Sequence, residues 1–297
     1  MRYHVENEFL IATVESLGAE PVSVVDKATG AELLWNRDPA VWPRQAPILF
    51  PNAGRMKNGS YTLDGKTYTG YQHGFARDLE HEFLGVEGSS MQFVLRSSAE
   101  TLEKFPREFE LTSVFTLTGR TLRHTLAVKN TGNAELRFGI GYHPGFALPF
   151  DDQHTTADYE LRFDAPQTPV VIETGTGDIA GLVTGNTRVL MENSAVIPMD
   201  DRMFDNDSIC MSGLTAKTLS LVEKDTGRRV TVGLEGSPYT LIWSMPGNPT
   251  LKFLCIEPWH SLPDPANATG DWNDKPCAAA LAPGEGWHTD LDMTFDR

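Results

Sequence analysis

Residues 109–128 read FELTSVFTLTGRTLRHTLAV and carry the signal that decides the fold class. Apolar and polar side chains alternate on both sides of Gly119, and a period of two places every second side chain on the same face of a β-strand. The stretch therefore predicts two antiparallel strands that are joined by a tight turn at Gly119 and have one face buried. The positions that share this face are Phe109, Leu111, Phe115, Leu117, Leu122, His124, Leu126 and Val128.

The same alternation recurs at residues 91–95, 159–163, 230–234 and 291–295. Turn sequences separate such runs: Asp64-Gly65 lies between two β-prone segments, and the related sequences DKATG and EKDTG end at Gly30 and Gly227. Stretches with helical periodicity are hard to find. Many short strands with hairpin turns are typical of a sandwich or a barrel. At this length we predict an all-β fold, a large antiparallel two-sheet β-sandwich.

The bulk composition is that of an ordinary globular protein. The chain has 297 residues, of which 40% are hydrophobic and 22% are charged, and all-β architectures often use this length for one domain. Its 26 glycines and 19 prolines are spread along the sequence, and no linker or low-complexity segment separates two parts. We therefore expect residues 1–297 to form a single domain.

The net charge and the cysteines narrow the choice of partner and compartment. A formal net charge of -15 argues against nucleic acid and anionic membranes as partners, because both require a basic surface. Charged residues interrupt the N-terminal segment, which lacks the apolar core of a signal peptide, and no apolar run has the length of a membrane helix. The three cysteines are scattered without metal-type spacing. We expect a cytoplasmic protein, monomeric or homodimeric, that acts on a small molecule.

His143 stands in an unusual segment, FGIGYHPGFALP at residues 138–149. The three glycines of this segment allow the backbone to approach a neighbour or a ligand, and Pro144 restricts His143 to extended geometry. The imidazole is therefore held with little freedom. It is either a half-buried histidine that hydrogen-bonds to a backbone carbonyl or a functional group, and the segment alone does not decide between the two.

Two further stretches place cationic or titratable groups in turns. PILFPNAGRM, residues 47–56, runs from an apolar strand into a turn that carries Arg55, whose guanidinium suits hydroxyl, carboxylate or phosphate oxygens. In QHGFARD, residues 72–78, His73 precedes a glycine, so that its ring can stand in a cleft. In the same loop Arg77 and Asp78 can form a local ion pair. A surface arginine and a loop histidine are the alternatives.

Glu257 ends the apolar strand in FLCIEPWHSL, residues 253–262. A carboxylate at the inner end of such a strand is partly desolvated, which raises its pKa and makes it a usable base near neutral pH. Trp259 offers an aromatic face to the apolar side of a sugar ring. The FDND stretch at residues 204–207 adds Asp205 and Asp207, which can accept hydrogen bonds from hydroxyls or can simply be solvated.

Together these groups suggest acid–base chemistry on a polyhydroxylated ligand. A metal site is the competing interpretation, since histidine and carboxylate sets bind iron or zinc. However, the eight histidines are dispersed and form no HxH or HExxH run. The chain also lacks a GxSxG elbow, a P-loop and a dinucleotide fingerprint. The residues therefore argue against a metal site and against these enzyme classes.

The motifs PNAGR, QHGFARD, GYHPGF, FDNDSI and CIEPW, taken in this order, resemble the aldose 1-epimerase (galactose mutarotase) family, most closely its LacX-like branch. The resemblance covers the whole chain. It implies a β-sandwich that binds a hexopyranose on a concave face and needs no cofactor. It also implies that Glu257 is the general base, His143 the general acid and His73 an assistant at the ring oxygen.

The resemblance further implies that Arg55 and an aspartate of the FDND stretch bind the sugar, and we favour Asp207 over Asp205. Two departures from the galactose mutarotases leave the substrate open: PWHSLPD follows Glu257, and the arginine motif lacks their NRI-like form. Two alternatives remain, a sugar-binding sandwich without catalysis and an epimerase for a phosphorylated or sulfonated sugar. The second requires additional cations in the cleft, for which Arg77 and Arg107 are candidates.

Overall fold

The hairpin at residues 109–128 forms as predicted in the computed structural model, which describes residues 1–297. Strands β9 (Phe109–Thr118) and β10 (Thr121–Asn130) are antiparallel, with Leu122 opposite Leu117 and His124 opposite Phe115. Burial alternates along both strands, as the period of two requires. The glycine of the connecting turn, Gly119, has a positive φ of 56° that few other residues adopt without strain.

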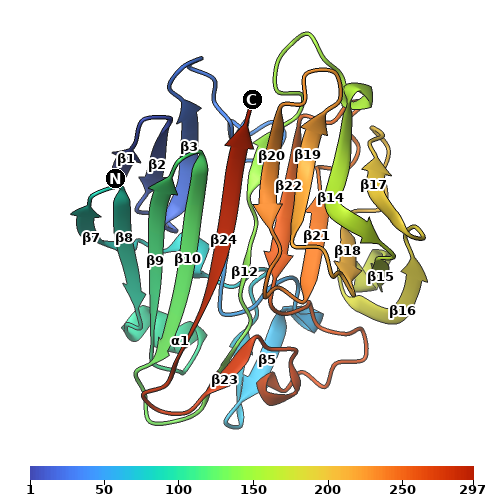
Figure 1. Cartoon of the computed structure of the whole chain (residues 1–297). Coiled ribbons are helices and arrows are strands. Elements are labelled where there is room, and N and C mark those ends of the chain that lie inside the picture. Colours follow the sequence, from blue (N-terminus) through green and yellow to red (C-terminus); the bar gives the residue numbers. More distant parts are fainter.

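This hairpin belongs to a nine-stranded antiparallel sheet, whose strands run from β7 to β17 across Figure 1. Strands from distant parts of the chain are neighbours in it, since β10 pairs with β24 at the C-terminus. The strands, in spatial order, are β7 (Glu82–Glu87), β8 (Ser90–Arg96), β9, β10, β24 (Gly286–Asp296), β20 (Arg229–Gly233), β19 (Thr218–Glu223), β14 (Tyr159–Gln167) and β17 (Ser194–Pro198).

A second, eight-stranded sheet completes the sandwich. Its strands, in spatial order, are β16 (Val183–Val189), β15 (Val170–Thr174), β18 (Ile209–Ser212), β21 (Tyr239–Trp243), β22 (Phe253–Trp259), β12 (Gly141–Tyr142) and β4 (Ile48–Leu49), with β13 (Gly145–Ala147) also paired to β22.

Smaller elements flank the two large sheets. The only α-helix, α1 (Ala99–Lys104), begins at a capping box in which Ser98 and Thr101 bond reciprocally. None of the helices is long and apolar enough to cross a membrane. The other elements are β1 (Arg2–Glu6), β2 (Leu10–Glu15), β3 (Glu20–Asp26), β5 (Ser60–Leu63), β6 (Lys66–Thr69), β11 (Leu136–Phe138), β23 (Ala279–Leu281), and the 3-10 turns η1 (Lys57–Gly59), η2 (Ala76–Asp78), η3 (Thr156–Asp158), η4 (Gly177–Ile179) and η5 (Trp272–Asp274).

The predicted turns are also present, with one small difference in a strand end. Asp64-Gly65 connects β5 to β6, and the turn that ends at Gly227 connects β19 to β20. Leu234, expected within the strand at 230–234, lies one residue beyond β20, although its N–H still bonds to the carbonyl of Lys217. The all-β sandwich expected from the sequence is therefore confirmed.

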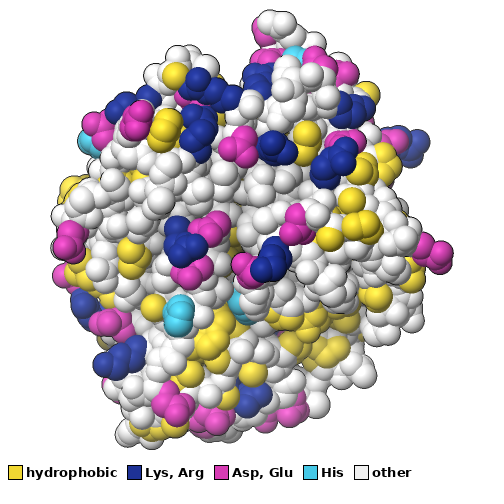
Figure 2. Space-filling view, viewed as in Figure 1, with side chains coloured by type: hydrophobic (Ala, Val, Ile, Leu, Met, Phe, Trp, Pro, Cys, Tyr) yellow, Lys and Arg dark blue, Asp and Glu magenta, His cyan; other side chains and the backbone are white.

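The main hydrophobic core contains side chains from both large sheets, such as Leu111 and Leu126 from the nine-stranded sheet and Ile242 and Ile256 from the eight-stranded sheet. On the surface seen in Figure 2, Lys and Arg side chains are interspersed with Asp and Glu and form no broad basic patch. That face of the molecule therefore lacks the electrostatic footprint of a nucleic-acid-binding surface.

Candidate active site

Strand β22 positions Glu257 on the side of its sheet that faces away from the main core. Leu254 and Ile256 belong to the main core, whereas Cys255 and Trp259 belong to two small clusters on the opposite face. Glu257 shares the parity of Cys255 and Trp259, because side chains alternate along a strand. It is only 1% exposed. The strand therefore delivers one carboxylate into an apolar setting, as its sequence predicted.

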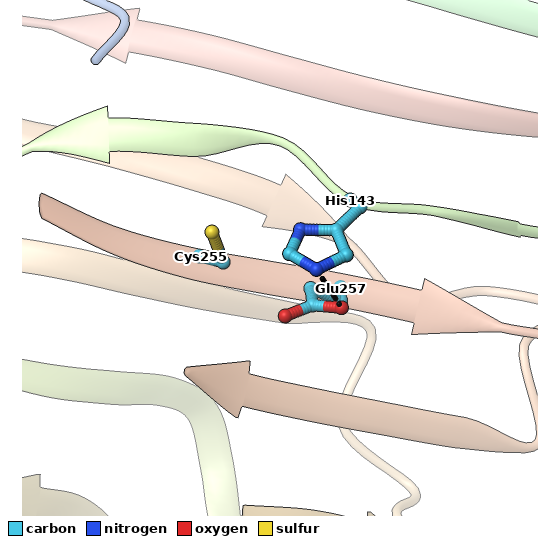
Figure 3. Close-up of side chains that lie close together, drawn as sticks. All are labelled: His143, Cys255 and Glu257. Carbon is cyan, nitrogen blue, oxygen red and sulfur yellow. Dashed lines mark ion pairs between the residues drawn. The ribbon is translucent and has the colours of Figure 1, made fainter. Parts of the chain in front are cut away.

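His143 lies directly opposite Glu257 in the same sheet. Gly141 pairs with Trp259 and Gly145 pairs with Cys255, which places the residue midway between the two glycines against Glu257. The imidazole Nε2 is 3.2 Å from the carboxylate Oε2. Figure 3 shows the two side chains pointing toward one another, with Cys255 beside them on the strand that carries Glu257.

The glycines on either side of His143 are needed because two indoles pack against the backbone there. A Cβ on Gly141 would lie 2.9 Å from Cδ1 of Trp259, and a Cβ on Gly145 would lie 2.8 Å from Cζ3 of Trp42. Both distances are too short for carbon–carbon contacts. The close approach expected from the glycine-rich segment therefore takes place, and its partners are tryptophans.

Burial disfavours charge on both members of the pair. It raises the pKa of Glu257 well above the usual carboxyl range, and the negative charge of Asp207 adds to this effect. Burial also lowers the pKa of His143 to about 3, and the nearby positive charge of Arg77 contributes in the same direction. The buried pair consequently favours a state with one proton between its two members, a carboxylic acid facing a neutral imidazole.

His73 lies beside this pair and is also buried. Its ring centroid is 5.6 Å from that of His143, with the two rings perpendicular. Its Nδ1 accepts the N–H of Gly54 at 3.1 Å, which leaves the proton of the neutral ring on Nε2. Burial, followed by the charge of His143, lowers the pKa of His73 well below the usual range. The His73 ring is therefore held in place by a hydrogen bond, and its environment favours the neutral form.

A cavity of about 450 Å³ opens over these groups, which we call the site cavity. Its size is within the range of small-molecule sites. The six residues that the sequence analysis favoured for the catalytic and sugar-binding site all line it: Arg55, His73, His143, Asp207, Glu257 and Trp259. Asp205 does not line it, and its carboxylate instead pairs with Arg202 at 2.9 Å.

Trp259 has a second contact that its sequence position did not suggest. Its indole N–H donates to Oε2 of Glu257 at 3.1 Å, which partly offsets the effect of burial on the pKa of that carboxyl group. The indole is 3% exposed. Trp259 therefore lines the cavity and also orients Glu257.

Two tryptophans in the site were missed by the sequence analysis. Trp42 stacks on the His143 ring with centroids 5.1 Å apart and an interplanar angle of 29°. Trp243 meets the same ring edge-on at 5.6 Å. Trp42 lies in a loop outside any periodic pattern, and only its place beside Pro43 and Arg44 distinguishes it in the sequence.

Of the two arginines considered as ligands for an anionic substrate, one lines the site cavity and the other does not. Arg77 lines the site cavity, together with Arg44, which the sequence analysis did not single out. Arg107 is absent from the cavity wall and binds Asp64 through two nitrogens, at 2.7 and 3.2 Å. The pairing expected between Arg77 and Asp78 is loose, at 4.0 Å, because Asp78 binds Arg44 at 2.5 Å.

Two groups of side chains have the spacing of a metal site. The ligand atoms of His143, Cys255 and Glu257 lie within 4.8 Å of one another, and so do those of Asp151, His154 and Glu223. In the second group Arg228 forms ion pairs with both Asp151 and Glu223 and offsets part of their negative charge. The first group contains the buried pair of His143 and Glu257.

The chain matches the sequence model of the aldose 1-epimerase family over residues 1–294. It is 29% identical to the chromosomal LacX protein of Lactococcus lactis subsp. lactis over 305 aligned positions, which cover 99% of both chains. A galactose mutarotase related enzyme from Lactobacillus acidophilus superposes with a TM-score of 0.92 at 31% identity, covering 100% of this chain and 98% of the other.

A galactose mutarotase-like protein from Lactobacillus casei gives a TM-score of 0.90 at 28% identity, covering 99% of this chain and 100% of the other. These similarities extend over the motifs that form the site cavity and over both sheets of the sandwich. The resemblance seen in the motifs is therefore confirmed, and the chain belongs to the aldose 1-epimerase family of isomerases.

Proposed function

We propose that the protein interconverts the α and β anomers of a hexopyranose by opening and reclosing the sugar ring. The observation that carries this proposal is the contact of 3.2 Å between His143 Nε2 and Glu257 Oε2, buried at one side of the site cavity. It brings one acid and one base to a single point, which a protein that merely binds sugars does not require. The full length of the chain, residues 1–297, would serve this function as one domain.

Ring opening consists of two proton transfers and one bond cleavage, and reclosure reverses them. Glu257 removes the proton from the C1 hydroxyl while His143 gives a proton to the ring oxygen, and the C1–O5 bond breaks. The product is the open aldehyde, which rotates about C1–C2. On reclosure at the other face of the carbonyl, the C5 hydroxyl returns its proton to His143, Glu257 gives its proton to the C1 oxygen, and the other anomer forms. No electrons are transferred, and the chemistry requires no redox partner.

The protonation of the pair suits this cycle. Catalysis needs a proton on His143 and none on Glu257, so the pair must hold one proton in total. The buried pair favours one proton, although burial places it on the carboxyl group. Transfer across the short contact converts this resting form into the reactive form, and the hydroxyl groups of a bound sugar would stabilise the charges that result.

The remaining residues of the cavity bind and orient the sugar. Arg55 forms no ion pair, and its one side-chain hydrogen bond, to the carbonyl of Ala180, is long at 3.4 Å, so most of its donors are free for sugar hydroxyls. Asp207 supplies acceptors, and His73 is placed to hydrogen-bond near the ring oxygen. Trp259 orients Glu257 and contributes an apolar wall.

Anomeric exchange measured by NMR saturation transfer tests the proposal. A panel of free aldoses and aldose phosphates is incubated with enzyme and compared with a buffer blank, because anomers also interconvert spontaneously in water. We expect exchange of at least one hexose to exceed the blank, and Glu257→Gln to abolish the excess. Saturable sugar binding without any acceleration would instead identify a non-catalytic sugar-binding protein.

A further inference from the structure

Two arginines, Arg44 and Arg77, are neighbours in the wall of the site cavity. Arg44 is in the loop before β4 and Arg77 is in η2, and Nη1 of Arg44 donates to the carbonyl of Arg77 at 3.4 Å. Both side chains line the cavity. The carboxylates nearest to them, Asp78 and Glu20, do not line it, and Asp78 is half-exposed to solvent. The cavity wall therefore includes both arginines but neither of the carboxylates nearest to them.

The hydrogen-bonding capacity of Arg77 is largely unused. One of its terminal nitrogens, Nη2, donates to the carbonyl of Gln72 at 2.9 Å. Its Nε is buried and has no hydrogen-bond partner. The closest carboxylate, Asp78, is 4.0 Å from that nitrogen and is bound by Arg44. A buried N–H donor without a partner is costly, and a ligand that supplies an acceptor removes the cost.

Arg44 and Arg77 are also close to the two histidines of the site, His73 and His143. The charges of Arg77 and Arg44 both contribute to the lowered pKa values of His143 and His73. In a hexopyranose, the ring oxygen is bonded to C1 on one side and to C5 on the other, and C5 carries the exocyclic carbon. In a sugar bound with its ring oxygen at the histidines and C1 at Glu257, the exocyclic carbon lies on the side of the ring oxygen away from Glu257. Arg44 and Arg77 are the cationic groups near the histidines that can meet it there.

We infer that the substrate is an aldohexose with a tetrahedral anionic group, a phosphate ester or a sulfonate, on its exocyclic carbon, and that Arg44 and Arg77 bind this group. The inference rests on the proposed epimerase function and specifies its substrate class. A guanidinium with free N–H groups binds such oxyanions through paired, charge-assisted hydrogen bonds. A neutral hydroxymethyl group would leave most of these donors unused.

Exchange rates for matched sugars test the inference. Glucose and galactose, their 6-phosphates and 6-deoxy-6-sulfoglucose are compared by NMR saturation transfer, each against its own buffer blank. We expect kcat/KM to be at least 10-fold higher for one anionic sugar than for its neutral parent, the scale of one charge-assisted hydrogen bond. The phosphate and sulfonate arms show which oxyanion is accepted. Faster exchange of a neutral sugar than of every anionic one overturns the inference and leaves the proposed function intact.

Arginine variants test which side chain binds the anionic group of the sugar. Arg77→Gln should lower the ratio of kcat/KM for the anionic sugar to that for its neutral parent by about 10- to 100-fold. Arg77→Lys keeps the charge and should lower the ratio less. The control is Arg162→Gln, which removes a half-exposed arginine from β14, outside the cavity, and should leave the ratio unchanged. Equal losses for both sugars in Arg77→Gln would overturn the assignment.

Discussion

His143 and Glu257 meet because the antiparallel register of β12, β13 and β22 places them opposite each other, with Nε2 and Oε2 3.2 Å apart. They are 114 positions apart in the sequence, and the glycines on either side of His143 allow the two segments to approach. In the sequence analysis, the family resemblance assigned the roles of base and acid to these two residues. In the structure they are in direct contact, so that a single shared proton can serve both.

Replacement of Glu257 tests this relationship. Glu257→Gln keeps the size of the side chain but cannot accept a proton, and turnover should fall by about 100-fold or more. His143→Asn should have a similar effect, and the double variant should lose far less than the product of the single losses, because the pair acts as one unit. Saturation transfer gives the rates. Near-normal exchange in Glu257→Gln would exclude this base and make Asp207 the next candidate.

The pH dependence of turnover should reflect a pair that works with one proton. Burial lowers the pKa of His143 to about 3, so uptake of a second proton, and loss of activity, should occur only in strongly acidic solution. Because the pKa of Glu257 is raised, the pair should lose its single proton only at higher pH, and this loss should produce the basic limb of the profile. The two apparent values belong to the pair. A profile of kcat/KM with circular dichroism at each pH checks this, and an acid limb near 6.5, typical of a solvated histidine, would contradict it.

Trp42 should position the imidazole of His143. Removal of the stacked indole in Trp42→Ala should lower kcat by roughly 2- to 10-fold, the energy scale of one aromatic pair. Trp42→Phe retains a ring and should lose less. Separate values of kcat and KM show whether the indole acts on chemistry or on binding. A rise in KM with unchanged kcat would show that Trp42 contributes to sugar binding and does not position His143.

Activity should survive removal of metal ions. The proposed reaction moves only protons, although His143, Cys255 and Glu257 are close enough to coordinate a metal. Exhaustive dialysis against a chelator should therefore leave anomeric exchange unchanged, with dialysis against plain buffer as the control. Loss of exchange that zinc or iron restores would replace the acid–base mechanism with a metal-dependent one, and Cys255→Ala would then prevent the restoration.

His124 should make the fold sensitive to acid. It is buried in the face of β10 that forms the core, stacked on Phe115, and burial lowers its pKa to about 3. The unfolded chain binds a proton at this residue near pH 6.5 and the folded chain does not. The stabilisation is therefore present at neutral pH and is lost as the pH falls from about 6.5 toward 3, which amounts to about 2 to 3 kcal/mol between pH 7 and 4.5.

Urea unfolding at these two pH values measures the effect. In His124→Phe the difference in the free energy of unfolding between pH 7 and pH 4.5 should shrink by about that amount. The larger phenylalanine ring can change the absolute stability of this variant, but that change is the same at both pH values. His4→Phe, at an exposed position, is the control and should keep the difference of the wild type. An unchanged difference in His124→Phe would show that other groups govern the acid response.

The sequence by itself determined the local properties of this protein. The period of two from Phe109 to Val128 specified strands with one buried face, because a pleated strand sends alternate side chains to opposite sides. Glycines with positive φ, such as Gly119, marked the turns. The FLCIEPW segment likewise placed Glu257 in an apolar environment, since its neighbours along the strand are hydrophobic.

Only the tertiary structure decided which distant segments meet. The register of β22 with β12 and β13, the stacking of Trp42 on His143, and the placement of Arg44 beside Arg77 all join residues from separate elements. Local propensity carries no information about such pairs, because strand pairing over long separations depends on how two complete sheets pack. The buried contact between His143 and Glu257 and the pair of arginines in the cavity wall both arise from these long-range contacts.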